Sequence, residues 1–399
     1  MKKLNSKALD YHAFPQPGKL SVSSSKTCDT AEDLSLAYTP GVAEPVLEIV
    51  KDPKNAYRFT NKGNLVAVIT NGTAVLGLGN TGALASKPVM EGKGVLFKRF
   101  ADIDVYDIEI DCEDPDEFIQ TVVNISPTFG GINLEDIAAP ECFYIESELK
   151  KRLSIPVFHD DQHGTAVIVA AGLINALEIQ QKLIEKVKIV FLGAGAAGCS
   201  CARLLKLMGA TDITMVDSKG ILSNDRKNLN QYNQDLAIDT KGKTFNDAIQ
   251  HADVFIGVSG ANLLKDEHVK SMSKKPIIFA LANPDPEMLP SEAHAIRDDI
   301  VMATGRSDFD NQVNNVLGFP FLFKGALEAK AKQINTDMLI AAANALALLA
   351  KEPVPQSVLE AYDVADLNFG PNYIIPKPFD PRLIDWVAKA VKEAYKEDK

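Results

Sequence analysis

The chain has 399 residues, 46% of them hydrophobic and 24% charged, values typical of a globular protein rather than a disordered one. This length exceeds what one ordinary hydrophobic core organises, so two domains are expected. The formal net charge of -11 argues against nucleic acid or an anionic membrane surface as the main partner.

The cysteines and the apolar runs bear on the cellular compartment. The chain has five cysteines, an odd number with no C-x-x-C pair, and this favours free thiols in a reducing environment. The amino terminus lacks the apolar stretch of a signal peptide. The longest apolar stretch, residues 338–350, is too short to span a bilayer. We therefore expect a cytoplasmic protein with no membrane partner.

The first part of the chain predicts a small α/β unit. A polar arm or short helix over residues 1–30 is followed by a helix over 45–51. Short apolar runs predict strands at residues 65–70, 94–100 and 105–110. Because Pro88 and Gly92 interrupt the segment between the first two of these runs, we expect no continuous helix there.

From residue 165 onward, helical and strand patterns alternate. Runs rich in apolar residues predict strands at residues 187–192, 212–216, 254–258 and 276–281, and the first of these is expected to be a continuous buried strand. This alternation indicates a doubly wound parallel sheet of the Rossmann type. Helices over 326–350 and 380–395 are expected to close the chain. The predicted division is a smaller N-terminal α/β domain over 1–160 and a Rossmann-type domain with closing helices over 161–399.

The glycine pattern G-x-G-x-x-G occurs twice, at residues 77–82 and 193–198. Only the second copy directly follows a predicted strand and opens an unbroken helix, as a dinucleotide turn requires. We therefore assign the dinucleotide to Gly193, Ala194, Gly195, Ala196, Ala197 and Gly198. The first copy is either a loop that brings backbone close to the substrate or an ordinary structural turn.

Asp217 ends the next predicted strand, at the distance expected of a carboxylate that meets the adenosine ribose. A carboxylate there favours NAD, because it repels the 2′-phosphate of NADP. Ser218 and Lys219 follow and could face that phosphate, so NADP stays an alternative.

Adjacent carboxylates occur twice, as Glu135-Asp136 and Asp160-Asp161. Taken alone, each pair could be a solvated turn or a helix cap. Together they could hold a hard divalent cation such as Mg²⁺ or Mn²⁺, with positions left open for a substrate. The histidines that flank Asp160 do not form the H-E-x-x-H pattern of zinc sites, which disfavours zinc.

The whole set of motifs resembles the malic enzymes in their short, bacterial-type form. The matching motifs are collinear over most of the chain and comprise Tyr38–Ala43, Ile132–Ile137, Phe158–Ala166 and Asn314–Pro320. The resemblance implies metal-dependent oxidative decarboxylation of L-malate to pyruvate and CO₂ with reduction of NAD, with oxaloacetate as a second substrate. It also implies a homodimer whose N-terminal domain serves substrate binding and dimerisation.

The resemblance also implies roles for individual residues. Lys93 would take the proton of the C2 hydroxyl and Tyr38 would protonate C3 of enolpyruvate, with Lys87 and Lys98 as rivals of Lys93. The implied metal ligands are Glu135, Asp136 and Asp161. Ser259 and Asn283 would lie at the cofactor rim, and the implied substrate residues are Lys93, Asn283, Asn314 and Asn315.

One position departs from the family. The large animal and plant malic enzymes have an arginine just before the first glycine turn, where this chain reads Thr73-Ala74-Val75-Leu76. We therefore expect backbone amides near Gly77, or Lys93, to bind the C4 carboxylate.

Two other activities stay open. A metal-dependent oxaloacetate decarboxylase would not need the intact turn at residues 193–198 together with Asp217. An enzyme like the amino-acid dehydrogenases would leave the paired carboxylates unexplained.

Overall fold

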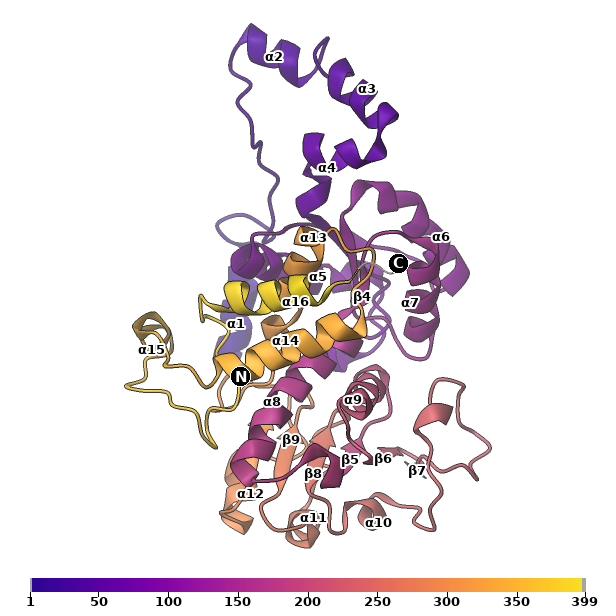
Figure 1. Cartoon of the computed structure of the whole chain (residues 1–399), viewed down its shortest axis with the longest axis vertical. Helices are drawn as coiled ribbons and strands as arrows, with labels where there is room; N and C mark the ends of the chain where they lie inside the picture. Colours follow the sequence, from indigo (N-terminus) through magenta and orange to yellow (C-terminus); the bar gives the residue numbers. More distant parts are fainter. Residues whose placement is uncertain (1, 397–399) are drawn as a thin grey trace.

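The computed structural model describes residues 2–396 and contains two parallel sheets, one near each end of the main body (Figure 1). The first sheet has four parallel strands in the order β2-β1-β3-β4. Their bounds are β1 (Leu65–Thr70), β2 (Asp104–Glu109), β3 (Gly131–Leu134) and β4 (Val157–His159). All six residues of the central strand β1 are buried, as expected of a parallel strand covered on both faces.

The second sheet has the order β10-β9-β8-β5-β6-β7, with only β7 antiparallel. The bounds are β5 (Lys188–Leu192), β6 (Asp212–Asp217), β7 (Gly220–Ile221), β8 (Val254–Gly257), β9 (Ile277–Ala280) and β10 (Val301–Thr304). The chain winds outward from β5 in one direction and then returns to β8 to wind in the other. This confirms the doubly wound α/β fold and places a topological switch point between β5 and β8, where ligands bind in such sheets.

Helices surround and connect the two sheets. The N-terminal helices are α1 (Lys2–Ala13), α2 (Ala31–Ala37), α3 (Ala43–Lys51), α4 (Ala56–Phe59), α5 (Ala83–Ala101), α6 (Pro115–Ile125) and α7 (Glu141–Arg152). The later helices are α8 (Thr165–Gln180), α9 (Ala196–Leu207), α10 (Phe245–Ile249), α11 (Asp266–Ser271), α12 (Pro290–Ile296), α13 (Phe319–Glu328), α14 (Thr336–Leu349), α15 (Gln356–Tyr362) and α16 (Lys389–Ala394). Within residues 2–396, no helix is long and apolar enough to cross a membrane, and the cytoplasmic location stays a prediction.

Helix α5 corrects two expectations, because residues 94–100 form no strand and Pro88 does not interrupt the helix. The side chains of Met90, Lys93 and Phe97 are buried at spacings of three and four, which is the period of a helix. A proline inside a helix costs about 3 kcal/mol. Burial of this long face offsets that cost. The single helix expected over 326–350 is likewise wrong, since α13 ends at Glu328 and α14 begins at Thr336.

The closing helices contact the first sheet's layer as well as the second. The ring of Phe97 on α5 lies 4.7 Å from that of Phe319 and 5.3 Å from that of Phe323, centroid to centroid. Phe323 also contacts Phe158 of β4, at 5.7 Å. Helix α13 therefore packs against the N-terminal unit, and the predicted domain boundary near residue 160 stays a prediction.

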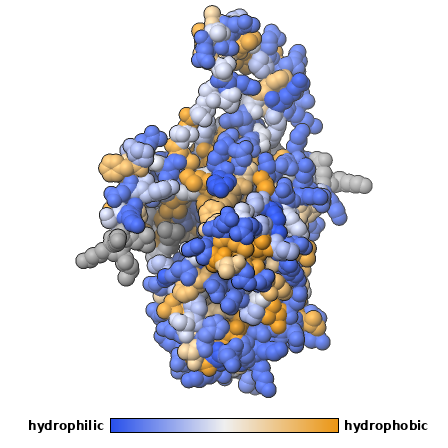
Figure 2. All heavy atoms as spheres, turned by 90° about the vertical axis from the view of Figure 1, so that its left-hand side faces the viewer, coloured by the Kyte–Doolittle hydropathy of each residue, from blue (hydrophilic) through white to orange (hydrophobic). Residues whose placement is uncertain are grey.

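Residues 31–59, which hold α2, α3 and α4, form an arm that projects from the main body (Figure 1). None of these three helices has a buried residue. Apolar side chains lie among polar ones on the projecting end of the molecule (Figure 2). The arm therefore has no core of its own within one chain.

Candidate active site

A cavity of about 770 Å³ lies between the two sheets, at the carboxyl ends of strands from both. Helix α5 and the segments that follow β3, β4, β8 and β9 contribute side chains to it. The predicted site residues that line it are Lys93, Glu135, Asp136, Asp161, Ala197, Ser259, Asn283, Asn314 and Asn315. Residues far apart in the sequence therefore meet at the edge where this architecture binds ligands.

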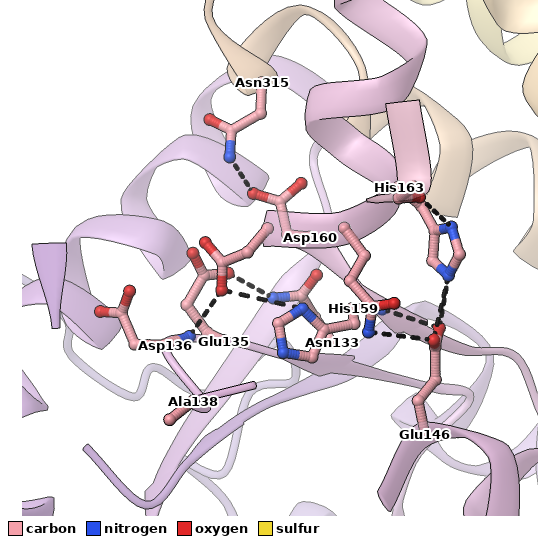
Figure 3. A network of polar contacts seen from close by, with 12 residues as sticks. Asn133, Glu135, Asp136, Ala138, Glu146, His159, Asp160, His163 and Asn315 are labelled. Carbon is pink, nitrogen blue, oxygen red and sulfur yellow. Dashed lines mark hydrogen bonds and ion pairs between the residues drawn. The ribbon is translucent and has the colours of Figure 1, made fainter. Parts of the chain in front are cut away.

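The carboxylates of Glu135, Asp136 and Asp161 form a compact cluster in which one oxygen of each lies within 4.8 Å of the others. The backbone N–H of Asp136 donates to Asp161 at 2.9 Å, and Asn133 donates to Glu135 at 2.9 Å (Figure 3). Burial raises the pKa of Glu135 well above its usual value, since the charge of Lys93 is offset by the neighbouring carboxylates. A cluster of hard oxygen donors with excess negative charge suits a divalent cation.

Lys93 is only 7% exposed, and its Nζ lies 2.6 Å from Asp160 and 2.9 Å from Glu135. It also lies over the ring of Phe319, 4.3 Å from the centroid. Burial lowers the pKa of Lys93, but the two carboxylates outweigh burial and raise the pKa above its usual value. Lys93 is therefore protonated when its carboxylate partners carry their full charge. Sequence reasoning had not paired Lys93 with Asp160.

The two rival lysines are held elsewhere. Lys87 pairs with Asp107 at 2.6 Å, and Lys98 pairs with Asp104 at 3.0 Å. Neither is among the residues that line the cavity. The position of Lys93 therefore favours it over both as the group that meets a substrate.

Tyr38 does not join this cluster. It directly follows α2 in the arm, is 70% exposed and is not among the residues that line the cavity. Within one chain, the structure therefore separates Tyr38 from Lys93, although the family resemblance assigns both to one reaction.

The turn after β5 has the geometry that a dinucleotide needs. Gly193 has a φ of 121°, and a Cβ there would lie 2.7 Å from the carbonyl oxygen of Val258. A Cβ at Gly198 would lie 1.9 Å from the oxygen of Gly193, so α9 can approach the turn only without a side chain there. Gly195, which caps α9, faces open space, and Ala194 and Ala196 lie beside it. A pyrophosphate could approach the helix N-terminus at this point.

Asp217 ends β6 as predicted, but its carboxylate is engaged. Arg226 donates from both terminal nitrogens, at 2.9 and 2.7 Å, and the backbone N–H of Lys219 donates at 2.8 Å. Burial alone would raise the pKa of Asp217, but these donors outweigh burial and lower it. Sequence reasoning missed Arg226, because no motif spacing marks a loop residue nine positions after the strand.

The amides at the rim have different partners. Asn315 donates to Asp160, whereas Asn314 accepts from the backbone N–H of Val316 at 3.0 Å. Asn283 borders the first glycine loop, since a Cβ at Gly77 would lie 3.0 Å from its carbonyl oxygen. Gly77 itself lines the cavity, so the first glycine loop does bring backbone to this site.

A Rossmann-type turn that faces a cavity lined by acidic and amide side chains defines the class of dinucleotide-dependent oxidoreductases. The sequence matches the malic enzyme N-terminal domain over residues 17–150 and the malic enzyme NAD-binding domain over residues 162–361. The chain belongs to the malic enzyme family, as its motifs predict.

Similar proteins agree with this placement. The chain is 59% identical over 389 residues to an NADP-dependent malic enzyme of Halomonas elongata, covering 97% of this chain and 92% of that protein. It is 56% identical to an NADP-dependent malic enzyme of Escherichia coli. That match covers 98% of this chain but only 52% of the longer protein. The crystal structure of an NAD-dependent malic enzyme from Thermotoga maritima has a TM-score of 0.88 and 43% identity, with 96% and 98% of the two chains covered. The chain therefore matches bacterial malic enzymes of about its own length as well as longer ones, of which it spans about half.

Proposed function

We propose that this protein catalyses the metal-dependent oxidative decarboxylation of L-malate to pyruvate and CO₂ with reduction of NAD or NADP, and that it also decarboxylates oxaloacetate. The observation that carries the proposal is one cavity that joins the carboxylate cluster and Lys93 to the rim of the dinucleotide turn. A decarboxylase alone would not need that turn, and an amino-acid dehydrogenase would not need the cluster.

We place Mg²⁺ or Mn²⁺ on Glu135, Asp136 and Asp161, whose carboxylate oxygens converge. When bound, a divalent ion polarises the C2 oxygen and stabilises the negative charge that develops on it. Substitution of Asp161 by Asn removes one of these charges without touching the glycine turn. Metal-dependent turnover should then be lost while dinucleotide binding persists.

In this proposal, Lys93 takes the proton of the C2 hydroxyl as hydride leaves for the nicotinamide. Its carboxylate partner Glu135 belongs to the metal cluster, so neutralisation of Glu135 would weaken the attraction that keeps Lys93 protonated. Asn283 and Asn315, which line the cavity, would orient a carboxylate or the nicotinamide amide. After CO₂ leaves, Tyr38 protonates C3 of enolpyruvate.

The arm supports a homodimer in which Tyr38 of one subunit serves the cavity of the other. The helices of the arm bury no residue within their own chain, although apolar side chains are exposed along them. These side chains are Leu34, Leu36, Val42, Val46, Leu47, Val50, Tyr57 and Phe59. A second copy of the chain would cover this surface and would also bring Tyr38 to a cavity that the tyrosine does not line within its own chain.

Mixed dimers test the shared site. Lys93→Ala and Tyr38→Phe subunits, each alone, should form pyruvate at least roughly 10²-fold more slowly than the wild type. Random reassociation makes half of the dimers mixed. Each mixed dimer would hold one intact site, so roughly a quarter of wild-type activity should return. Mixtures of Lys93→Ala with Asp161→Asn subunits are the control, because both residues belong to one subunit's cavity and no intact site can form. No recovery in the first mixture would contradict the shared site.

The reaction itself is tested by steady-state assays with malate, oxaloacetate and glutamate, each with and without Mn²⁺. We expect reduction of the dinucleotide only with malate and Mn²⁺, and CO₂ release from oxaloacetate with Mn²⁺. Activity with glutamate, or malate oxidation that is indifferent to chelation of the metal, would contradict the proposal.

We propose that the pair of Asp217 and Arg226 decides between NAD and NADP. A free Asp217 would favour NAD, but Arg226 neutralises it and could itself meet a 2′-phosphate. Asp217→Ala should raise the NADP:NAD ratio of kcat/KM, and Arg226→Ala should lower it. If this ratio changed equally in Asp217→Ala and Arg226→Ala, the 2′-position of the bound dinucleotide would have to lie elsewhere.

A further inference from the structure

Glu146 on α7 is a buried carboxylate outside the metal cluster, with 5% of its surface exposed. It accepts hydrogen bonds from the backbone N–H of His159 and from Gln162 Nε2, each at 3.3 Å. It also contacts His163 Nε2 at 2.8 Å and the ammonium of Lys150 at 2.7 Å. Three of these four partners lie within residues 159–163 (Figure 3).

Residues 159–163 contain Asp160 and Asp161, two of the acidic residues at the site. The chain leaves β4 and enters a π-helical turn at residues 160–164, which places Asp160 on Lys93 and Asp161 on the backbone N–H of Asp136. The turn is tightly packed, since a Cβ at Gly164 would lie 1.9 Å from Asp160. Glu146 therefore holds the turn on both sides of the two aspartates while touching neither of them.

The contact between Glu146 and His163 extends to Ser200 on α9. Nδ1 of His163 lies 3.2 Å from the hydroxyl of Ser200 on α9, the helix that begins at the glycine turn. Donation from Nε2 of His163 to Glu146 and acceptance at Nδ1 from Ser200 would satisfy every group in the series, which is how we assign the tautomer. The series thus connects α7, the turn and α9.

The order serine, histidine, glutamate is also that of a hydrolytic triad, but the position of the serine argues against this function. Ser200 is buried and is not among the residues that line the cavity. A nucleophile must reach its substrate. The contacts of Glu146 are therefore better explained by the turn that they hold.

We propose that Glu146 is a positioning residue that sets the conformation of the metal-binding turn and, through His163 and Ser200, fixes this turn against the dinucleotide helix. This inference rests on the proposed function, because it needs a metal on Asp161. Groups that hold metal ligands in place typically change metal affinity by about 10–100-fold when they are replaced. The expected signature is a loss of metal affinity with dinucleotide affinity retained.

The test measures Mn²⁺ binding by electron paramagnetic resonance and dinucleotide binding by fluorescence without metal, in the full-length protein. In Glu146→Gln, one acceptor oxygen becomes an amide donor that faces other donors. The Mn²⁺ dissociation constant should rise about 10–100-fold, while the dinucleotide dissociation constant stays near that of the wild type. Glu148→Gln is the matched control, because Glu148 lies on the same helix but pairs with Lys151 and Arg152. It should bind Mn²⁺ as the wild type does.

A second variant decides the case if Glu146→Gln does not fold, as judged by thermal unfolding without metal. Ser200→Ala keeps Glu146 and removes only the far hydroxyl, so the Mn²⁺ dissociation constant should rise by about fivefold, the effect of one hydrogen bond. Wild-type Mn²⁺ affinity in a folded Glu146→Gln protein, or in Ser200→Ala, overturns the inference. Failure of the proposed function would instead appear in the wild type, as absence of Mn²⁺ binding.

Discussion

The cavity and the arm each carry one of the two proposed proton carriers, and they differ in how they are held. Lys93 is 7% exposed and has its partners in place within one chain, whereas Tyr38 is 70% exposed and directly follows α2, a helix with no buried residue. A buried ammonium without partners would be strongly destabilising, so a single chain must complete its surroundings. An exposed phenol carries no such cost, so its partner can come from another subunit.

One chain therefore positions part of the site by its own fold, whereas in our proposal the rest of the site is completed only in a dimer. The carboxylate cluster, Lys93 and the rim of the dinucleotide turn converge because two sheets place the carboxyl ends of their strands at one cavity. The arm has no comparable constraint within the chain. The site is therefore built by the fold on one side and, in our proposal, by assembly on the other.

Loss of Lys93 should have the largest effect. Lys93→Ala removes the proposed base, and general bases typically contribute about 10²–10⁴-fold, so malate oxidation should fall by this order. Small amines should restore part of the rate by occupying the vacated space. The measurement is kcat for dinucleotide reduction, with a metal-binding assay to show that the cluster survives. Lys98→Ala on the same helix is the control, since Lys98 pairs with Asp102 and Asp104 outside the cavity.

A Lys93→Ala enzyme that oxidises malate at nearly the wild-type rate would remove the base assignment. The buried lysine would then not be a proton carrier, and its contacts with Asp160 and Glu135 would be structural only.

Loss of the Tyr38 hydroxyl should have a severe but later effect. Tyr38→Phe should leave hydride transfer possible and slow the protonation of enolpyruvate by about 10²–10⁴-fold, the contribution of a general acid. Deuterium incorporation at C3 of pyruvate, followed in deuterated solvent, measures this step directly. Tyr57→Phe alters the same arm without touching the assigned acid and should keep the wild-type exchange rate. Rapid exchange in Tyr38→Phe would dismiss Tyr38 as the acid.

Much of the fold follows from local sequence. The strands at residues 188–192 and 254–257 consist mainly of apolar residues, and both were predicted from that pattern. Residues 94–100 were assigned to a strand wrongly, because a short apolar run does not reveal its period. Their helix depends on burial of Lys93 and Phe97 against partners distant in sequence.

The site divides in the same way. The glycine turn and the adjacent carboxylates are local patterns, and the structure brings the carboxylates into one cavity. The pairing of Lys93 with Asp160 and of Asp217 with Arg226 could not be predicted, because no local spacing encodes it. The separation of Tyr38 from the cavity was also missed, since a motif gives a residue's identity but not its distance from the others.

Substitutions on the arm should weaken the proposed dimer more gently. Leu47→Asp puts a charge on an exposed apolar position of α3, which would lie in the interface between two copies. The apparent mass in analytical ultracentrifugation should shift toward the monomer, and activity should fall with the dimer. Glu48→Gln on the same helix is the control, since Glu48 pairs with Lys51 at the surface. A Leu47→Asp protein that stays dimeric would place the interface elsewhere.

The smallest expected effect is on the rates of thiol labelling. These rates report on the interior through Cys199 and on the arm through Cys28. Burial raises the pKa of Cys199 to about 11. A free thiol has a pKa near 8.5, so at pH 8 Cys199 has roughly 10²-fold less thiolate. Its labelling should therefore be slow and should rise as the pH approaches 11. Cys28 is exposed just before α2, and its labelling should slow a few-fold when the protein is concentrated enough to dimerise.

Leu47→Asp makes the labelling comparison sharper, because in that variant Cys28 should react at one rate at all protein concentrations. Cys199 should be unaffected by the same substitution, since its Sγ lies 3.3 Å from the carbonyl oxygen of Ala194 inside the dinucleotide unit. Two results would contradict this division between a buried interior and an arm covered by a second subunit. One is a labelling rate of Cys199 that depends on protein concentration, and the other is a labelling rate of Cys28 in the wild type that does not.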